Sequence, residues 1–208
     1  TDPEVYAARA ELRLQLKDRN GAMDDLGTAI KQGKRPAHFL RRGELHWEER
    51  AYEAAQQDFT AVIRRDSSRA YAWYRRGLTH EVMDQLEEAA ADFAAAQERG
   101  LAPSYRQEME QVIGDYVQQA EAAARRNELE TAVSLYQKAL TLDPAVAEHW
   151  YQLAQVYWRQ RDLFSALEAY DEALSLEVGL EKAWRGRGET LIELARYEEA
   201  VEAFESAL

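Results

Sequence analysis

The chain has 208 residues, with 26 Lys and Arg against 38 Asp and Glu, so its formal net charge is −12. This acidic balance argues against broad nucleic-acid binding, and the lack of any Cys excludes disulfides, thiolate zinc sites and Cys nucleophiles. Only four Pro and ten Gly, among abundant Ala, Glu, Gln, Leu and Arg, favour an all-α chain. No apolar run approaches the ~20 residues that span a bilayer, so direct membrane insertion is not expected.

Aromatic residues recur along the chain, mostly at a spacing of 34 residues. Those that mark the pattern are Tyr6, Phe39, Trp73, Tyr116, Trp150 and Trp184. Each is followed four residues later by Gly or Ala and sixteen residues later by Ala, and all but the first by an aromatic residue at twenty. An aromatic and a small residue four apart lie on one helical face, where the small residue lets a second helix approach. The pattern therefore predicts six pairs of antiparallel helices.

These residues resemble the tetratricopeptide repeat (TPR) family, whose period is 34 and whose pattern is W-x₂-L-G-x₂-Y, then A-x₃-F, then P. Residues 147–180 match best, through Trp150, Leu153, Ala154, Tyr157, Ala166, Tyr170 and Ala173. The resemblance implies a right-handed superhelical α-solenoid, in which stacked helix pairs bury one continuous core.

We expect six repeats in chain order. Repeats one to three cover about 3–35, 36–69 and 70–103, and repeats four to six cover 113–146, 147–180 and 181–208. Residues 104–112 are an insertion, because Trp73 and Tyr116 are 43 residues apart. We expect one extended helix over about 105–125, with Gly114 as the position at which it could break.

The two blocks of repeats differ in charge. Residues 1–103 carry a net charge of −2, and residues 104–208 carry −10. The sequence starts with neither an initiator Met nor a secretory leader and stops at Leu208, inside the second helix of repeat six. It is therefore interpreted as an excised fragment with a truncated last repeat, from a bacterial cytoplasm or periplasm that the sequence does not distinguish.

No group of residues predicts catalysis or a cofactor. His46 and His80 are 34 residues apart and occupy one repeat position, which favours packing over metal binding, and no zinc-binding spacing occurs. Gly186-Arg187-Gly188 lies inside a predicted helix, so it is not interpreted as a phosphate loop. Nothing assembles a nucleophile, a base and an oxyanion donor. The prediction is a non-enzyme without metal or cofactor.

The resemblance places the ligand groove on the first helix of each repeat. Aromatic and Arg residues are enriched in binding hot spots. At or beside the groove positions the sequence has Arg41, Trp47, Tyr71, Tyr74, Arg75, Tyr151, Gln155, Trp158, Arg159 and Arg185. These residues are the predicted partner-binding set. Cochaperone repeats that grip a chaperone C-terminus use Lys at the fifth and Asn at the ninth position, which are Leu40 and Glu44 in repeat two. A chaperone-tail clamp is therefore not expected.

The predicted function is a non-catalytic scaffold that binds another protein or peptide through the concave groove. Two alternatives remain open at this point. One is a periplasmic scaffold of a bacterial exopolysaccharide secretion system that recruits a modifying enzyme. The other is a structural array that self-associates through its uncapped C-terminal helix.

Overall fold

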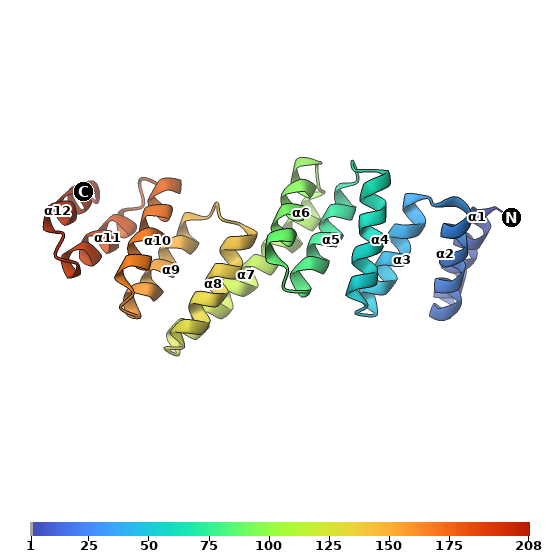
Figure 1. The fold of residues 1–208 in the computed structure, drawn as a ribbon, viewed down its shortest axis with the longest axis horizontal. Coiled ribbons are helices and arrows are strands. Elements are labelled where there is room, and N and C mark those ends of the chain that lie inside the picture. The colour runs from blue at the N-terminus through green and yellow to red at the C-terminus, as the bar shows by residue number, and fades with distance from the viewer. Residues whose placement is uncertain (1) are drawn as a thin grey trace. The chain divides into compact units, whose positions relative to one another are not determined.

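The computed structural model describes residues 2–208, and in that part of the chain it has twelve α-helices and no strand (Figure 1). The helices are α1 (Pro3–Gln15), α2 (Arg19–Gly33), α3 (Pro36–Glu48), α4 (Tyr52–Arg65), α5 (Ala70–Val82), α6 (Leu86–Glu98), α7 (Pro103–Arg125), α8 (Leu129–Leu142), α9 (Ala147–Arg159), α10 (Leu163–Leu176), α11 (Glu181–Glu193) and α12 (Tyr197–Ser206). The predicted all-α fold of successive helix pairs is confirmed.

The chain divides into two compact units, unit 1 (Thr1–Arg106) and unit 2 (Gln107–Leu208). In unit 1, α1 packs on α2, α3 on α4 and α5 on α6, and in addition α2 contacts α3 and α4 contacts α5. In unit 2, α9 packs on α8 and α10, and α11 packs on α10 and α12. α2 to α5 and α9 to α11 are thus each covered by two neighbours, which is how repeats that cannot bury a core alone become stable.

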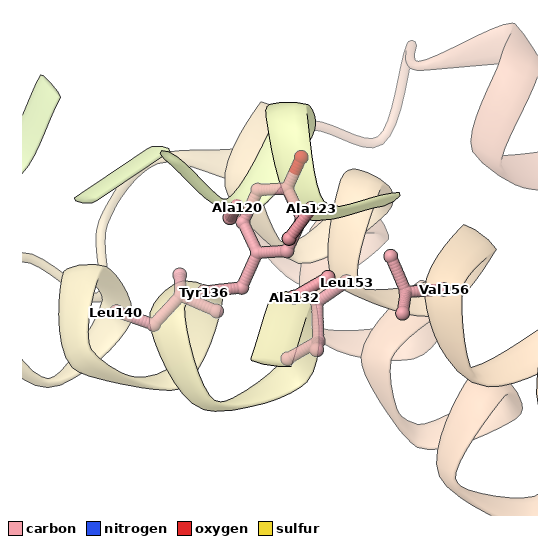
Figure 2. Packing of buried hydrophobic residues seen from close by; sticks show 7 residues of the cluster. All are labelled: Ala120, Ala123, Ala132, Tyr136, Leu140, Leu153 and Val156. Carbon is pink, nitrogen blue, oxygen red and sulfur yellow. The ribbon is translucent and has the colours of Figure 1, made fainter. Parts of the chain in front are cut away.

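Small residues let the paired helices cross closely. A Cβ atom on Gly77 would lie 2.6 Å from the ring of Phe93, sixteen residues further on, so no larger residue fits there without displacing the ring. Repeat four has Ala at this position: Figure 2 shows the ring of Tyr136 reaching from α8 to Ala120 and Ala123 of α7. Both Ala residues are fully buried.

Each helix pair turns through one residue with a positive φ angle. These residues are Lys17, Arg50, Asp84, Asn127, Arg161 and Ala195, with φ between 58° and 66°. Only Asp84 and Asn127 are of types that tolerate this left-handed conformation comparatively well. The composition of the turns alone therefore does not identify them.

The inserted segment forms part of one continuous helix. α7 has 23 residues and runs without interruption through Gly114, which is exposed and has no atom within 4 Å of an added Cβ. The expected extended helix near 105–125 is confirmed, and Gly114 does not break it. Within the described residues, no helix combines the length and hydrophobicity that crossing a membrane would require.

Candidate functional site

The predicted groove residues of unit 1 lie on the first helices α3 and α5, and most of them interact with one another. The guanidinium of Arg41 donates to both oxygens of Glu11, at 2.8 and 3.1 Å, and to Glu44 at 3.2 Å. The hydroxyl of Tyr71 donates to the other oxygen of Glu44 at 3.0 Å. Burial, with the nearby Glu44 carboxylate, raises the pKa of Tyr71 to about 12. This series of hydrogen bonds links the first helices of all three repeats in the unit.

Trp47 and Arg75 form the other part of this face in unit 1. The guanidinium of Arg75 lies 4.7 Å from the ring centre of Trp47 and 5.7 Å from that of Phe59. The indole N–H of Trp47 and the Nε of Arg75 are buried, and neither has a hydrogen-bond partner among residues 2–208. Buried donors without partners are uncommon, which makes this pair a site where an added acceptor would be stabilising.

The assignment of Tyr74 to an exposed groove position is wrong. Its side chain is 1% exposed, because the first turn of α7 covers it. The ring of Tyr105 lies 5.2 Å from Tyr74 and 4.9 Å from Tyr71, centre to centre. Tyr105 follows Tyr71 by 34 residues, so the start of α7 continues the repeat of unit 1. The 34-residue spacing between Tyr71 and Tyr105 was therefore the feature of the sequence that indicated the burial of Tyr74.

In unit 2 the predicted residues lie on α9 and α11. The ammonium of Lys182 sits 4.6 Å from the ring centre of Tyr151 and pairs with Glu148 at 2.5 Å. Gln155 donates to the hydroxyl of Tyr170 at 2.6 Å. The structure therefore brings Tyr151 and Gln155 onto one side of α9, close to α10 and α11.

The remaining predicted residues of unit 2 are more loosely held. Arg159 is exposed and donates to the Asn127 side chain at 3.1 Å. Trp158 is half-buried, and its indole N–H is buried without a hydrogen-bond partner, like that of Trp47. Arg185 is exposed and borders a separate hollow with Lys182.

A hollow of ≈ 350 Å³ opens on this face of unit 2, and Gln155 and Arg159 are among its lining residues. The others are Glu121, Ala124, Arg125, Tyr136, Gln152 and Val156. Tyr136 is 1% exposed, and its hydroxyl forms no hydrogen bond within the described part of the chain. Burial raises the pKa of Tyr136 to about 12, so the hydroxyl stays protonated at neutral pH. The hollow thus offers a phenol donor, two amides, two guanidinium groups and one carboxylate.

Unit 1 also contains buried ion pairs that the sequence analysis missed. In each repeat of unit 1, an Arg of the first helix donates two hydrogen bonds of 2.6–2.8 Å to an Asp of the second helix, sixteen residues later. The pairs are Arg9–Asp25, Arg42–Asp58 and Arg76–Asp92, and each Asp is 3% exposed. Their recurrence at the repeat period was the available signal. The corresponding pairs in unit 2 are Gln119–Leu135, Leu153–Ala169 and Arg187–Ala203.

His80 completes the last of these pairs. Its Nδ1 lies 3.1 Å from Asp92, and its Nε2 lies 2.8 Å from the amide nitrogen of Gln56. His46 stands at the same position beside Asp58, at 3.8 Å. Both residues therefore lie against carboxylates inside the helix pairs. Among the described residues, no three His, Asp or Glu side chains are grouped so as to hold a metal ion.

Because of these buried carboxylates, we expect acid to destabilise unit 1 more than unit 2. Hydrogen bonding to Arg9 holds the pKa of Asp25 below its ordinary value; for Asp92, hydrogen bonds from Arg76 and His80 outweigh the opposing effect of burial. A carboxyl group whose pKa is lower in the folded than in the unfolded state stabilises the fold at pH values above its unfolded pKa, near 3.8. This stabilisation is lost as the pH falls through the pKa of the folded state.

Between pH 6 and pH 3, the protection of amide hydrogens against exchange, relative to the intrinsic rate at each pH, should therefore fall more in α1–α6 than in α8–α12, because unit 2 has no Asp at the matching positions. Mass spectrometry of peptic fragments would measure it. An equal loss of protection in both units would show that the buried Asp residues do not control acid stability.

A family model described as TPR repeat matches residues 121–160, and one described as Tetratricopeptide repeat matches residues 40–105 and 151–208, more than half of the chain. No curated protein matches the sequence.

Several solved structures have a similar fold. The TPR domain of P58(IPK) is 18% identical over 100% of this chain and 60% of that one, with a TM-score of 0.52. YrrB, described as a TPR protein with an unusual peptide-binding site, is 20% identical over 88% of this chain and 90% of that one, with a TM-score of 0.44. The TPR2AB domain of yeast Sti1, in complex with pHSP90, is 13% identical over 99% and 89%, with a TM-score of 0.44. From the repeats, the helix pairs and the matching family models, the chain belongs to the tetratricopeptide repeat family.

Proposed function

We propose that this chain is a protein-interaction scaffold that binds a segment of a partner protein on the face formed by the first helices of its repeats. TPR proteins are in general non-catalytic scaffolds for protein interactions. The observation that carries the proposal for this chain is the hollow on α7, α8 and α9. It gathers polar groups from three helices around a buried tyrosine whose hydroxyl has no partner in the described chain.

The proposed partner-binding residues lie on the first helices of both units. In unit 2 they are Tyr151, Gln155, Trp158, Arg159 and Arg185, and in unit 1 they are Arg41, Trp47, Tyr71 and Arg75. Tyr74 is removed from the set because it is buried. Trp158 and Arg159 are the strongest candidates, since aromatic and Arg side chains that become fully covered contribute most to binding.

Trp158→Ala should weaken the affinity for a captured partner about thirtyfold, which corresponds to ~2 kcal/mol for the loss of a hot-spot side chain. Tyr136→Phe should weaken it about fivefold through one lost hydrogen bond, without harming the fold, because Phe59, Phe93 and Phe204 occupy the same repeat position. Isothermal titration of the partner isolated by affinity capture would measure both effects.

The matched control is Glu198→Lys with Glu202→Lys, which changes exposed residues of α12. This pair should leave the affinity for a partner on the first-helix face nearly unchanged. If the Lys pair abolished binding while Trp158→Ala had no effect, the partner would lie along the acidic last helix, and the proposed face would be abandoned.

A second candidate, self-association, is favoured by exposed apolar side chains on the first and last helices. Val5 and Leu12 of α1 are 63% and 59% exposed, and Leu16, directly after α1, is 79% exposed. Tyr197 and Val201 of α12 are 60% and 56% exposed. Such residues mark interaction sites when they gather on one face. Sedimentation equilibrium over a range of concentrations distinguishes a self-associating array from a monomeric scaffold. The exopolysaccharide alternative has no comparable observation in its support.

A further inference from the structure

The aromatic residues that mark the repeats are almost all covered by a cation from the chain itself. The distances from cation to ring centre are 5.5 Å for Arg9–Tyr6, 4.4 Å for Arg65–Phe39, 4.7 Å for Arg99–Trp73, 5.8 Å for Lys138–Tyr116 and 5.9 Å for Arg187–Trp184. Trp150 is the exception, because no cation of the described residues 2–208 lies over its ring.

The sequence of repeat five explains the exception. The covering cation comes from three, twenty-two or twenty-six residues after the aromatic residue in the other repeats. In repeat five these positions are Leu153, Glu172 and Leu176. Repeat five therefore has apolar or acidic side chains wherever another repeat supplies its cation.

An open groove of ≈ 630 Å³ borders Trp150, between α8, α9 and α10. Leu140, Leu153 and Ala169 give it apolar walls, and Glu168 and Glu172 of α10 line its opening. Both Glu residues are exposed, and neither has an ion-pair partner within the described part of the chain. The groove is thus acidic at its rim and aromatic and aliphatic inside.

Repeat three shows what fills the equivalent space. There Arg76 replaces Leu153, and its guanidinium lies 5.0 Å from the ring centre of Trp73 while it binds both oxygens of Asp92. It also donates to Thr60 of the preceding repeat at 3.1 Å. One fold therefore places a guanidinium on this aromatic residue in repeat three and leaves the same place open in repeat five.

We propose that an arginine side chain of a partner protein occupies this groove, with its guanidinium on the ring of Trp150 and its charge paired with Glu168 and Glu172. Arg suits the site better than Lys, since its planar group stacks on an aromatic ring and binds carboxylates through two N–H groups. The acidic charge of residues 104–208, −10, attracts such a basic segment.

This arginine-binding groove is independent of the proposed scaffold face. Along α9, Trp150, Leu153 and Tyr157 line the groove, while Tyr151 and Trp158 belong to the other site. At 100° per residue these two sets point about 120° apart, onto different faces of the helix. Either site can therefore fail its test while the other stands.

The probe is a tetra-arginine peptide, titrated into the ¹⁵N-labelled chain while the indole N–H signals of the five Trp residues are recorded. Comparison with Trp150→Phe assigns the Trp150 signal. We expect a saturable shift of that signal, an affinity that falls with salt, and no binding of tetra-citrulline, the uncharged analogue. Glu168→Gln with Glu172→Gln should weaken binding about tenfold, because both charge pairs are lost. Glu198→Gln with Glu202→Gln, which removes two charges from exposed positions of α12, should leave it unchanged.

The decisive variant is Leu153→Arg with Ala169→Asp, which installs the pair of repeat three and should fill the groove and abolish binding. Unchanged peptide affinity in this folded variant would overturn the proposal, as would equal binding of tetra-citrulline. Should the variant fail to fold, the Gln pair decides alone, since it alters only exposed side chains, and undiminished affinity there would overturn the proposal. Wild-type self-association that this variant removes would show that a second copy of the chain, rather than a partner protein, occupies the groove.

Discussion

Replacing Asp92 by Ala is expected to destabilise the chain by about 3 kcal/mol, because it leaves the charge of Arg76 largely buried without its partner. The Arg76 and His80 side chains are only 16% and 8% exposed, and each contacts the Asp92 carboxylate. The substitution removes the carboxylate that both side chains contact, and Ala offers no other acceptor in its place. Urea unfolding followed by circular dichroism would measure the loss in the free energy of unfolding.

The matched control tests whether the charge, rather than the lost volume, is responsible. Arg76→Leu, His80→Tyr and Asp92→Ala together install the three side chains that repeat five has as Leu153, Tyr157 and Ala169. Buried ion pairs replaced by packed apolar groups often cost little, so this triple variant should lie within about 1 kcal/mol of the parent. A triple variant as unstable as Asp92→Ala would show that packing at this crossing, and not the unpaired charge, sets the cost.

The helices could be predicted from the sequence because their burial is periodic. Ala55, Ala89 and Ala166 fall at one repeat position and are fully buried, and each lies in the second helix of its pair. The extended helix α7 could also be predicted, since the inserted residues contain no Pro after Pro103 and only Gly114 could have interrupted them. Local periodicity is enough for features that depend on local packing.

The candidate site could be predicted only in part, because exposure depends on what packs from outside the repeat. Trp47 and Trp158 were placed on the first helices correctly, but Tyr74 is covered by Tyr105, from a segment interpreted as an insertion. Contacts between charges of different repeats, such as Arg41 with Glu11, require the three-dimensional stacking of helices. The uncovered ring of Trp150 emerges only when all repeats are compared in space.

Gly114→Pro should destabilise the chain by ~3 kcal/mol or more, because position 114 lies in the interior of α7, eleven residues from each end of its 23. Pro removes one backbone hydrogen bond of the helix and its ring clashes with the carbonyl of Glu110. The cost concerns the backbone alone, since Gly114 is exposed and packs against nothing. Thermal unfolding followed by circular dichroism would measure it.

Gly114→Ala is the control, and it should act in the opposite direction. An added Cβ meets no atom within 4 Å, and Ala in a helix interior is more favourable than Gly by roughly 0.5–1 kcal/mol. A continuous α7 therefore predicts opposite signs for two substitutions at one exposed position. If Pro were tolerated and Ala brought no gain, the helix would bend at Gly114 in solution, and residues 103–113 and 115–125 would behave as two separate helices.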